Sequence, residues 1–298
     1  MSSICVIGAG KWGQALHYAL NQKQKCLITS RTKKEIENFV SLDVALECEY
    51  LVIAIPSQSI REWLTKNFKY TNPQQKVLVA AKGIEANSGA FLQEIYEEFV
   101  PKKNLGFISG PSFASEVIVG LPTALVLNSS SKQFYDEFYN FFPSFIKTYY
   151  SSDVIGAEIS GAYKNVLAIA SGICEGLHLG QNARASLISR GLVEMDRFGQ
   201  HYGANKDTFI GLSGAGDLFL TASSTLSRNF RVGLGLAKNK SLDEILEELG
   251  EVAEGVMTAQ AIYKLSVENE IYTPIANEVK FILEGKSPQD SLKDLLSD

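Results

Sequence analysis

Cysteine and histidine are scarce in this sequence. The four cysteines show no paired spacing, and the three histidines form no metal-ligand pattern with them, so we predict no metal site. We interpret all four cysteines as small buried hydrophobic residues. The residues concerned are Cys5, Cys26, Cys48, Cys174, His17, His178 and His201.

Long hydrophobic runs are also missing. The apolar runs, such as Leu51–Ile55, have the length of a strand and fall far short of a membrane span. The first residues lead directly into the apolar run Ile4–Ile7 and leave no room for a signal sequence. We therefore expect a cytoplasmic protein without membrane insertion.

Charge of one sign is not concentrated anywhere in the chain. The formal net charge is -5, and acidic and basic residues are interspersed without a cationic stripe. Binding to a phosphate backbone requires such a stripe, so nucleic acid is not an expected partner.

Strand-like segments dominate the first half of the chain. Several are apolar at every position, as strands covered by helices on both sides must be, and they alternate with helical patterns. This order predicts an α/β, Rossmann-like unit with a parallel, doubly wound sheet. The expected strands are Ile4–Ile7, Cys26–Thr29, Tyr50–Ile55, Val77–Ala81, Leu105–Ser109 and Ala124–Leu127.

The pattern changes after Tyr149–Ser152. From Asp153 onward the apolar residues recur at helical spacing, and Asp153 is a suitable N-cap for a long helix through Ala162–Ala170. With 298 residues, two domains are expected. We predict an NAD(P)-binding domain over residues 1–152 and an all-helical substrate domain over residues 153–298.

A glycine-rich turn follows the first expected strand. Gly8, Gly10 and Gly13 lie between that strand and a helical pattern, the context in which three glycines indicate dinucleotide binding. Gly8 permits the tight turn, Gly10 lets a pyrophosphate approach, and Gly13 allows close packing of helix on strand. A turn without a ligand is the alternative.

Arg31 follows the second expected strand, where NAD-binding folds usually carry an acid for the ribose 2'-hydroxyl. A guanidinium suits a 2'-phosphate instead. We therefore predict a preference for NADP, with NAD as the other cofactor. The alternative is a solvated basic segment.

Polar residues also follow later strands. Pro56–Ser57, Lys82–Gly83 and Gly110–Ala114 each come after an expected strand, at the edge where ligands bind in open α/β sheets. Taken alone, each of these segments is also typical of an ordinary turn without a ligand. Their shared position favours a functional role for Lys82 and Ser112.

Lys164 is the most informative residue of the second half. It lies among apolar residues of a helix with few other charges, and is either buried for a purpose or extends to water at an edge. Burial, and a second ammonium from Lys82, would lower its pKa toward neutrality. Such a lysine suits a general acid for a carbonyl oxygen.

Two further motifs follow Lys164. Asp217 ends the glycine-rich segment Gly211–Gly216 and either has a catalytic role or caps a helix. Ser227, Arg228 and Asn229 precede a helical pattern. Their hydroxyl, guanidinium and amide groups suit a phosphate monoester, and a capped surface helix is the alternative.

Taken together and in this order, these motifs resemble the bacterial NAD(P)-dependent glycerol-3-phosphate dehydrogenases over nearly the whole chain. The motifs are Gly8–Gly13, Ala81–Glu85, Gly110–Ala114, Lys164–Val166, Gly214–Asp217 and Ser227–Asn229. The resemblance implies oxidation of sn-glycerol 3-phosphate to dihydroxyacetone phosphate, running mainly in reverse to supply phospholipid synthesis. It also implies an all-helical second domain and a homodimer.

The family's functional residues transfer onto matching positions of this chain. Proton transfer falls on Lys164, and we predict Asp217 and Lys82 as further catalytic residues. The implied cofactor contacts, in addition to the turn with Lys11, are Trp12, Arg31, Lys82, Ala114, Arg228, Val252 and Glu254. The implied substrate contacts are Lys82, Gly110, Ser112, Lys164, Asp217, Ser227, Arg228 and Asn229.

One segment departs from the family pattern. Between Arg31 and Leu51 the chain is shorter than is usual in the family, so contacts near the adenosine end transfer less directly. Two other functions remain open: a dehydrogenase of similar build that acts on a different hydroxy acid or sugar phosphate, and a nucleotide sensor that binds NADP without catalysis.

Overall fold

The computed structural model describes residues 3–70, 72–250 and 253–297. The chain divides into two compact units. The first contains residues 1–82 and 92–154, and the second contains residues 83–91 and 155–298. Each unit has its own hydrophobic core.

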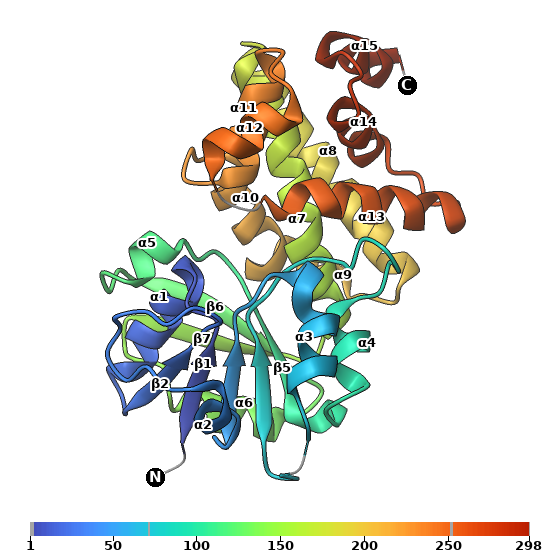
Figure 1. Ribbon diagram of the computed structural model, residues 1–298. Helices are drawn as coiled ribbons and strands as arrows, with labels where there is room; N and C mark the ends of the chain where they lie inside the picture. The colour runs from blue at the N-terminus through green and yellow to red at the C-terminus, as the bar shows by residue number, and fades with distance from the viewer. Residues whose placement is uncertain (1–2, 71, 251–252, 298) are drawn as a thin grey trace. The chain divides into compact units, whose positions relative to one another are not determined.

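A seven-stranded sheet forms the centre of the first unit, in the order β2-β1-β3-β4-β5-β6-β7 (Figure 1). The chain moves from β1 outward to β2 and then returns to place β3 on the other side of β1. This reversal creates a switch point beyond the carboxyl ends of β1 and β3, where ligands bind in such sheets. The strands are β1 Ile4–Ile7, β2 Cys26–Thr29, β3 Tyr50–Ile53, β4 Lys76–Val79, β5 Leu105–Ser109, β6 Thr123–Asn128 and β7 Ile146–Ser151.

The predicted α/β fold is confirmed, but the sheet is not wholly parallel. β6 pairs with β5 in the antiparallel direction, and β7 then runs parallel to β6. Only the short helix α5, Ala114–Val117, lies between β5 and β6, and no long helix carries the chain back as a parallel crossover requires. Strand β7 was missed because it alternates buried and exposed residues at the edge of the sheet.

Helices cover the sheet on both faces, as the fully buried strands require. All four residues of β1 are buried. Ile4 and Val6 share a core with α1 and α6, and since side chains alternate along a strand, Cys5 and Ile7 face the other side. The helices of this unit are α1 Lys11–Asn21, α2 Leu42–Leu46, η1 Ser57–Ser59, α3 Ile60–Asn67, α4 Leu92–Glu97, η2 Lys102–Asn104, α5 Ala114–Val117 and α6 Lys132–Tyr139.

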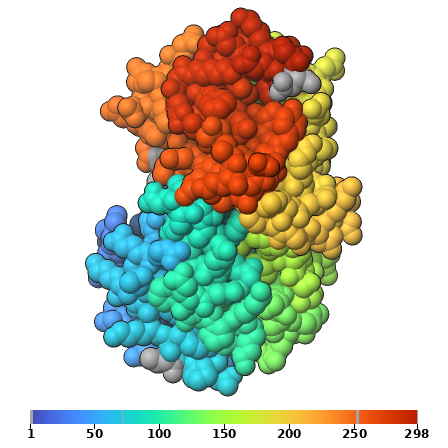
Figure 2. All heavy atoms as spheres, turned by 90° about the vertical axis from the view of Figure 1, so that its right-hand side faces the viewer, coloured from blue at the N-terminus to red at the C-terminus, as the bar shows by residue number. Residues whose placement is uncertain are grey.

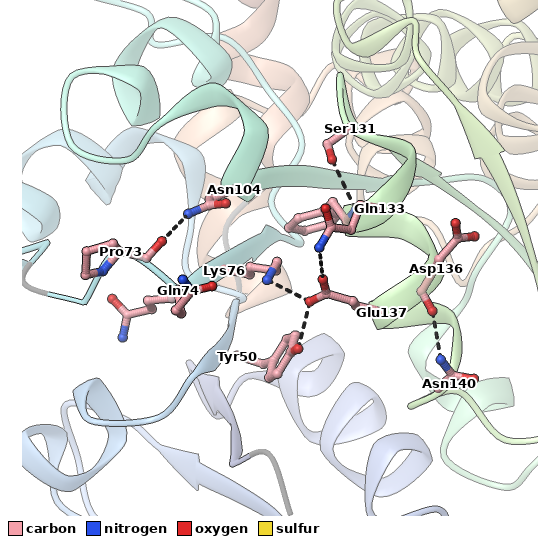
Figure 3. Close-up of polar contacts among 12 residues, drawn as sticks. Tyr50, Pro73, Gln74, Lys76, Asn104, Ser131, Gln133, Asp136, Glu137 and Asn140 are labelled. Atoms are coloured by element: carbon pink, nitrogen blue, oxygen red, sulfur yellow. Dashed lines mark hydrogen bonds and ion pairs between the residues drawn. The ribbon is translucent and has the colours of Figure 1, made fainter.

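A polar cluster lies at the amino ends of β3 and β4, away from the switch point. The buried ammonium of Lys76 lies 2.7 Å from a carboxylate oxygen of Glu137 in α6, and the hydroxyl of Tyr50 donates to the same oxygen at 2.8 Å (Figure 3). Gln133 donates to the other carboxylate oxygen. These contacts attach α6 to the sheet, so we interpret the cluster as structural.

The second unit is helical, as predicted. Its core includes residues of the long helix α7, which is buried over most of its length. Helices α13, α14 and α15 make the surface coloured deep orange to dark red in Figure 2. The helices are α7 Val154–Gly176, α8 Gly180–His201, α9 Lys206–Ile210, η3 Leu212–Gly216, α10 Asp217–Ala222, α11 Arg228–Ala237, α12 Leu242–Leu249, α13 Glu254–Glu268, α14 Pro274–Leu283 and α15 Pro288–Ser297.

A short segment from the first half of the sequence joins this helical unit. Ile84 and Phe91 pair through an isolated β-bridge and are buried in the helical core. The ammonium of Lys264 in α13 donates to the carbonyl of Asn87 at 3.1 Å. The division of the fold is therefore not linear in the sequence.

The four cysteines were predicted to be buried. All four are free and buried, which confirms their interpretation as small hydrophobic residues.

In the described parts of the chain, no helix has the length and apolar character to cross a membrane.

Candidate functional site

The glycine turn connects β1 to α1 at the switch point of the sheet. Gly8 has φ +110°, a value that L side chains rarely adopt, and its N–H donates to the carbonyl of Thr29 in β2 at 2.8 Å. A Cβ on Gly13 would lie 1.8 Å from the carbonyl oxygen of Gly8. The backbone of the turn and the start of α1 therefore pack so closely that only glycine fits at either position.

Gly10 differs from the other two glycines. A Cβ there would have no neighbour within 4 Å, and its φ of -72° suits any residue. Gly10 is also the N-cap of α1 and makes no side-chain cap. The fold itself does not require glycine at this position. Binding of an anion at the helix N-terminus would require it, because glycine lets the anion approach the backbone closely.

The other residues predicted to bind cofactor in this unit differ in their exposure. Lys11 is exposed at the first position of α1, and Trp12 is half-buried against the core. Ala114 opens α5 and packs against the same core. Arg31 is exposed in the loop after β2.

Lys82 and Ser112 meet at the carbonyl group of Gly110. The Lys82 ammonium donates to this oxygen at 3.3 Å and the Ser112 hydroxyl at 3.1 Å. Gly110 is buried directly after β5, with φ +103°. The structure thus brings together three of the predicted residues beyond the carboxyl end of the sheet.

In the helical unit, Lys164 forms a buried polar cluster with Asp217 and Thr221. Lys164 Nζ lies 2.6 Å from Oδ1 of Asp217 and donates to Oγ1 of Thr221 at 3.0 Å. The Thr221 hydroxyl in turn donates to Asp217 Oδ1 at 3.2 Å. Lys164 is 8% exposed and Asp217 is 1% exposed. The lysine is therefore buried with partners and does not extend along a surface.

Local backbone geometry places Asp217 in this cluster. The segment Leu212–Gly216 forms one turn of π-helix, closed by a bond from Gly216 N–H to the carbonyl of Gly211. Such turns occur often at functional sites. Asp217 is then the first residue of α10, whose N-cap is Gly216, so its carboxylate binds the lysine and does not serve as the N-cap.

Thr221 was not identified from the sequence. It lies four residues after Asp217 in the same helix, and this spacing places both side chains on one face. That spacing was the available signal. Asn165 belongs to the Lys164–Val166 motif but was not predicted as a site residue.

Asn165 and Asn229 connect three helices. Asn229 Nδ2 donates to Oδ1 of Asn165 at 2.9 Å, and Asn229 Oδ1 accepts from the N–H of Gly255 at 3.0 Å. Both side chains are buried. The amide of Asn229 thus fixes the start of α11 to α7 and α13, near the lysine cluster on α7.

The remaining predicted residues lie at the starts of α11 and α13. Ser227 is the N-cap of α11, and its hydroxyl accepts from the N–H of Phe230, while Arg228 is exposed at the first helical position. Glu254 is half-buried at the first position of α13. Val252 lies outside the described residues.

Burial affects a second acid in the helical unit. The carboxylate of Glu194 on α8 is 2% exposed and accepts from the hydroxyl of Tyr163, the neighbour of Lys164, at 2.8 Å. It also accepts from the N–H groups of Ile275 and Ala276 at the start of α14. Burial raises the pKa of Glu194 above its ordinary value.

Comparison with known proteins covers the whole chain. The family models for the N-terminus and C-terminus of NAD-dependent glycerol-3-phosphate dehydrogenase match residues 24–135 and 153–293. A glycerol-3-phosphate dehydrogenase [NAD(P)+] of Sulfurimonas denitrificans is 63% identical over 100% of both chains. One from Campylobacter jejuni is 60% identical over 98% of both chains.

A solved structure agrees with these relatives. The crystal structure of glycerol-3-phosphate dehydrogenase from Coxiella burnetii has a TM-score of 0.93 and 32% identity, and the match covers 100% of this chain and 99% of that one. The resemblance inferred from the motifs is confirmed. The chain belongs to the NAD-dependent glycerol-3-phosphate dehydrogenase family.

Proposed function

We propose that this protein is an NAD(P)-dependent sn-glycerol-3-phosphate dehydrogenase that interconverts dihydroxyacetone phosphate and sn-glycerol 3-phosphate. The observation that carries the proposal is the buried Lys164–Asp217–Thr221 cluster in a chain of this family. A buried cation with an acidic and a hydroxyl partner supplies the proton chemistry that ketone reduction requires.

The glycine turn fits the cofactor. Gly10 leaves open space at the start of α1, and the N–H groups of a helix start favour a pyrophosphate. Gly8–Gly13, Lys11, Trp12 and Arg31 would hold the dinucleotide, with Lys82, Ala114, Arg228 and Glu254 as further contacts. When bound, this cofactor supplies the hydride that reduces the ketone carbon.

Lys164 is the proton donor in the reductive direction. Its ammonium donates a proton to the ketone oxygen as that oxygen gains charge, and the neutral amine takes the proton back in the oxidative direction. Asp217 favours the ammonium form and, with Thr221, fixes its orientation. Lys82, beside Gly110 and Ser112, contributes a second positive charge toward the substrate.

The start of α11 suits the substrate phosphate. A phosphate monoester is stabilised by the N–H groups of a helix N-terminus and by a guanidinium, and Ser227, Arg228 and Asn229 provide both. Since Asn229 is already fixed to Asn165 and Gly255, it positions this helix start. Binding at the phosphate then orients the ketone.

Several broader properties belong to the same proposal. Residues 1–152 would act as the cofactor domain and residues 153–298 as the substrate domain. The product would supply the glycerol backbone of phospholipids in the cytoplasm, and the enzyme would be a homodimer. NADP is the preferred cofactor on the basis of Arg31.

One assay tests substrate, reaction and cofactor together. The purified protein is mixed with NADPH or NADH and dihydroxyacetone phosphate, and cofactor oxidation is followed by absorbance, with unphosphorylated dihydroxyacetone as the control. We expect oxidation with the phosphorylated ketone and much slower oxidation with the control. Equal rates, or activity only with other carbonyl compounds, would indicate a different dehydrogenase, and no oxidation with any substrate would indicate a nucleotide sensor.

A further inference from the structure

Lys34 connects the loop after β2 to the glycine turn. Its ammonium donates to the carbonyl oxygen of Ala9 at 2.7 Å, across 25 residues of sequence. Ala9 lies between Gly8 and Gly10, and its carbonyl also accepts from the side-chain amide of Gln14 in α1. A positive charge is thus held on the backbone of the turn that we propose to bind the pyrophosphate.

The loop that carries Lys34 is fixed at its base. Ile28 in β2 donates its N–H to the carbonyl of Asn38 and accepts from the N–H of Val40. The hydroxyl of Thr29 donates to the carbonyl of Val40 at 2.9 Å. The segment between Ser30 and Glu37 is therefore a short closed loop, and this closure holds Lys34 within reach of Ala9.

The loop is rich in positive charge. Arg31, Lys33 and Lys34 are all exposed, and in the described parts of the chain no ion pair joins them to a carboxylate. Glu35 and Glu37 follow in the same loop and are exposed as well. Of the three cations, Lys34 is the one whose side chain donates a hydrogen bond to the glycine turn.

The place of Lys34 determines which group it would meet. In dinucleotide-binding folds of this kind, the loop after the second strand contacts the adenosine ribose, and the glycine turn binds the pyrophosphate. An ammonium has three donors, of which one is used by Ala9. The other two remain available to an anionic ligand, because Lys34 is exposed.

We propose that Lys34 is a specificity-determining residue that acts with Arg31 to select a dinucleotide carrying a 2'-phosphate on its adenosine ribose. This inference rests on the proposed function, both for its catalytic readout and for the NADP preference assigned to Arg31. Lys34 supplies a compact positive charge fixed to the turn, and Arg31 supplies a planar guanidinium from the start of the same loop.

The test compares Lys34→Met with Lys33→Met, a matched control in which a neighbouring exposed lysine without the Ala9 contact is changed. For each variant, kcat/KM is measured with NADPH and with NADH at saturating dihydroxyacetone phosphate. We expect Lys34→Met to lower the value for NADPH by about tenfold or more, as the loss of a charge-assisted hydrogen bond does. The value for NADH should fall by only about twofold, and Lys34→Arg should keep the preference.

Two results would overturn the proposal. Equal losses for both cofactors would show that Lys34 merely supports the turn, and unchanged values for both would show that it contributes nothing. Dissociation constants for NADPH and NADH, measured by fluorescence titration, give the same comparison without turnover. If the wild-type protein proves inactive with dihydroxyacetone phosphate, these titrations still decide the role of Lys34.

Discussion

The ammonium of Lys164 lies 2.6 Å from the carboxylate of Asp217, and both groups are buried in the helical unit. This ion pair changes the interpretation of the lysine. Burial alone would favour the neutral amine, whereas a carboxylate at this distance favours the ammonium. In the mechanism that we propose, Lys164 would therefore begin the reductive reaction as the ammonium, with the proton that it has to donate, and Asp217 would hold it in place.

Replacing Lys164 with methionine tests this role. We expect kcat for dihydroxyacetone phosphate reduction to fall by roughly 10²- to 10⁴-fold, the usual contribution of a general acid. Because the variant leaves Asp217 buried without its partner, it also loses about 3–5 kcal/mol of stability. The double variant Lys164→Met/Asp217→Asn should recover stability but not activity, and near-normal turnover in either variant would refute the assignment.

Thr221 should orient the lysine through its hydroxyl group. Valine has a similar shape but cannot accept the bond from Lys164, so we expect Thr221→Val to lower kcat by about tenfold or more with little change in KM. Thr221→Ser keeps the hydroxyl and should keep most of the activity. Equal losses in the two variants would point to altered packing, and steady-state kinetics distinguishes these outcomes.

Two glycines of the same turn should respond in different ways to alanine. Gly13→Ala places a methyl group against the carbonyl of Gly8, so we expect a lower melting temperature and a destabilised first unit. Gly10→Ala meets open space and should leave the melting temperature within a few degrees of wild type, while raising KM for the cofactor about tenfold or more. A normal cofactor KM in Gly10→Ala would show that no ligand approaches this position.

Much of this organisation follows from local sequence. The fully apolar strands and the glycine spacing are local patterns, so β1 to β5 and the turn could be predicted from them. Strand β7 was not predicted, because an edge strand is only half buried and lacks a continuous apolar run. The antiparallel β6 depends on the length of a connection rather than on composition. Lys164 was identified because a lysine among apolar residues is conspicuous.

Other features depend on contacts between distant residues. The inward bonds of Asn229 require Asn165 and Gly255, and the contact of Lys34 with Ala9 requires a loop to fold back onto the turn. No spacing in the sequence encodes these partners. The association of residues 83–91 with the helical core likewise depends on packing of Ile84 and Phe91.

Arg31 should determine the cofactor preference from the outer part of the same loop. Arg31→Ala removes the guanidinium that suits a 2'-phosphate, so we expect kcat/KM for NADPH to fall by about tenfold or more and the value for NADH to change little. Steady-state kinetics with both cofactors measures the ratio. An unchanged ratio would mean that Arg31 is only a solvated residue of the loop.

Glu194 makes the stability of the helical unit depend on pH. Burial raises its pKa in the folded state above the ordinary value, so folding favours the protonated acid. The stability gained from this group is fully present below its unfolded pKa of about 4.3 and is lost as pH rises through the folded pKa. We therefore expect the free energy of unfolding of wild type, minus that of Glu194→Gln, to fall as pH rises above about 4 and then to level off.

Urea unfolding at a series of pH values measures this difference. Glu268→Gln, a change at an exposed position of α13, controls for the loss of one negative charge. A difference that increases with pH would mean that the N–H donors of Ile275 and Ala276 and the charge of Arg197 outweigh burial, because these groups favour the carboxylate. In that case Glu194 would stabilise the start of α14 as an anion, through the positive end of the helix dipole.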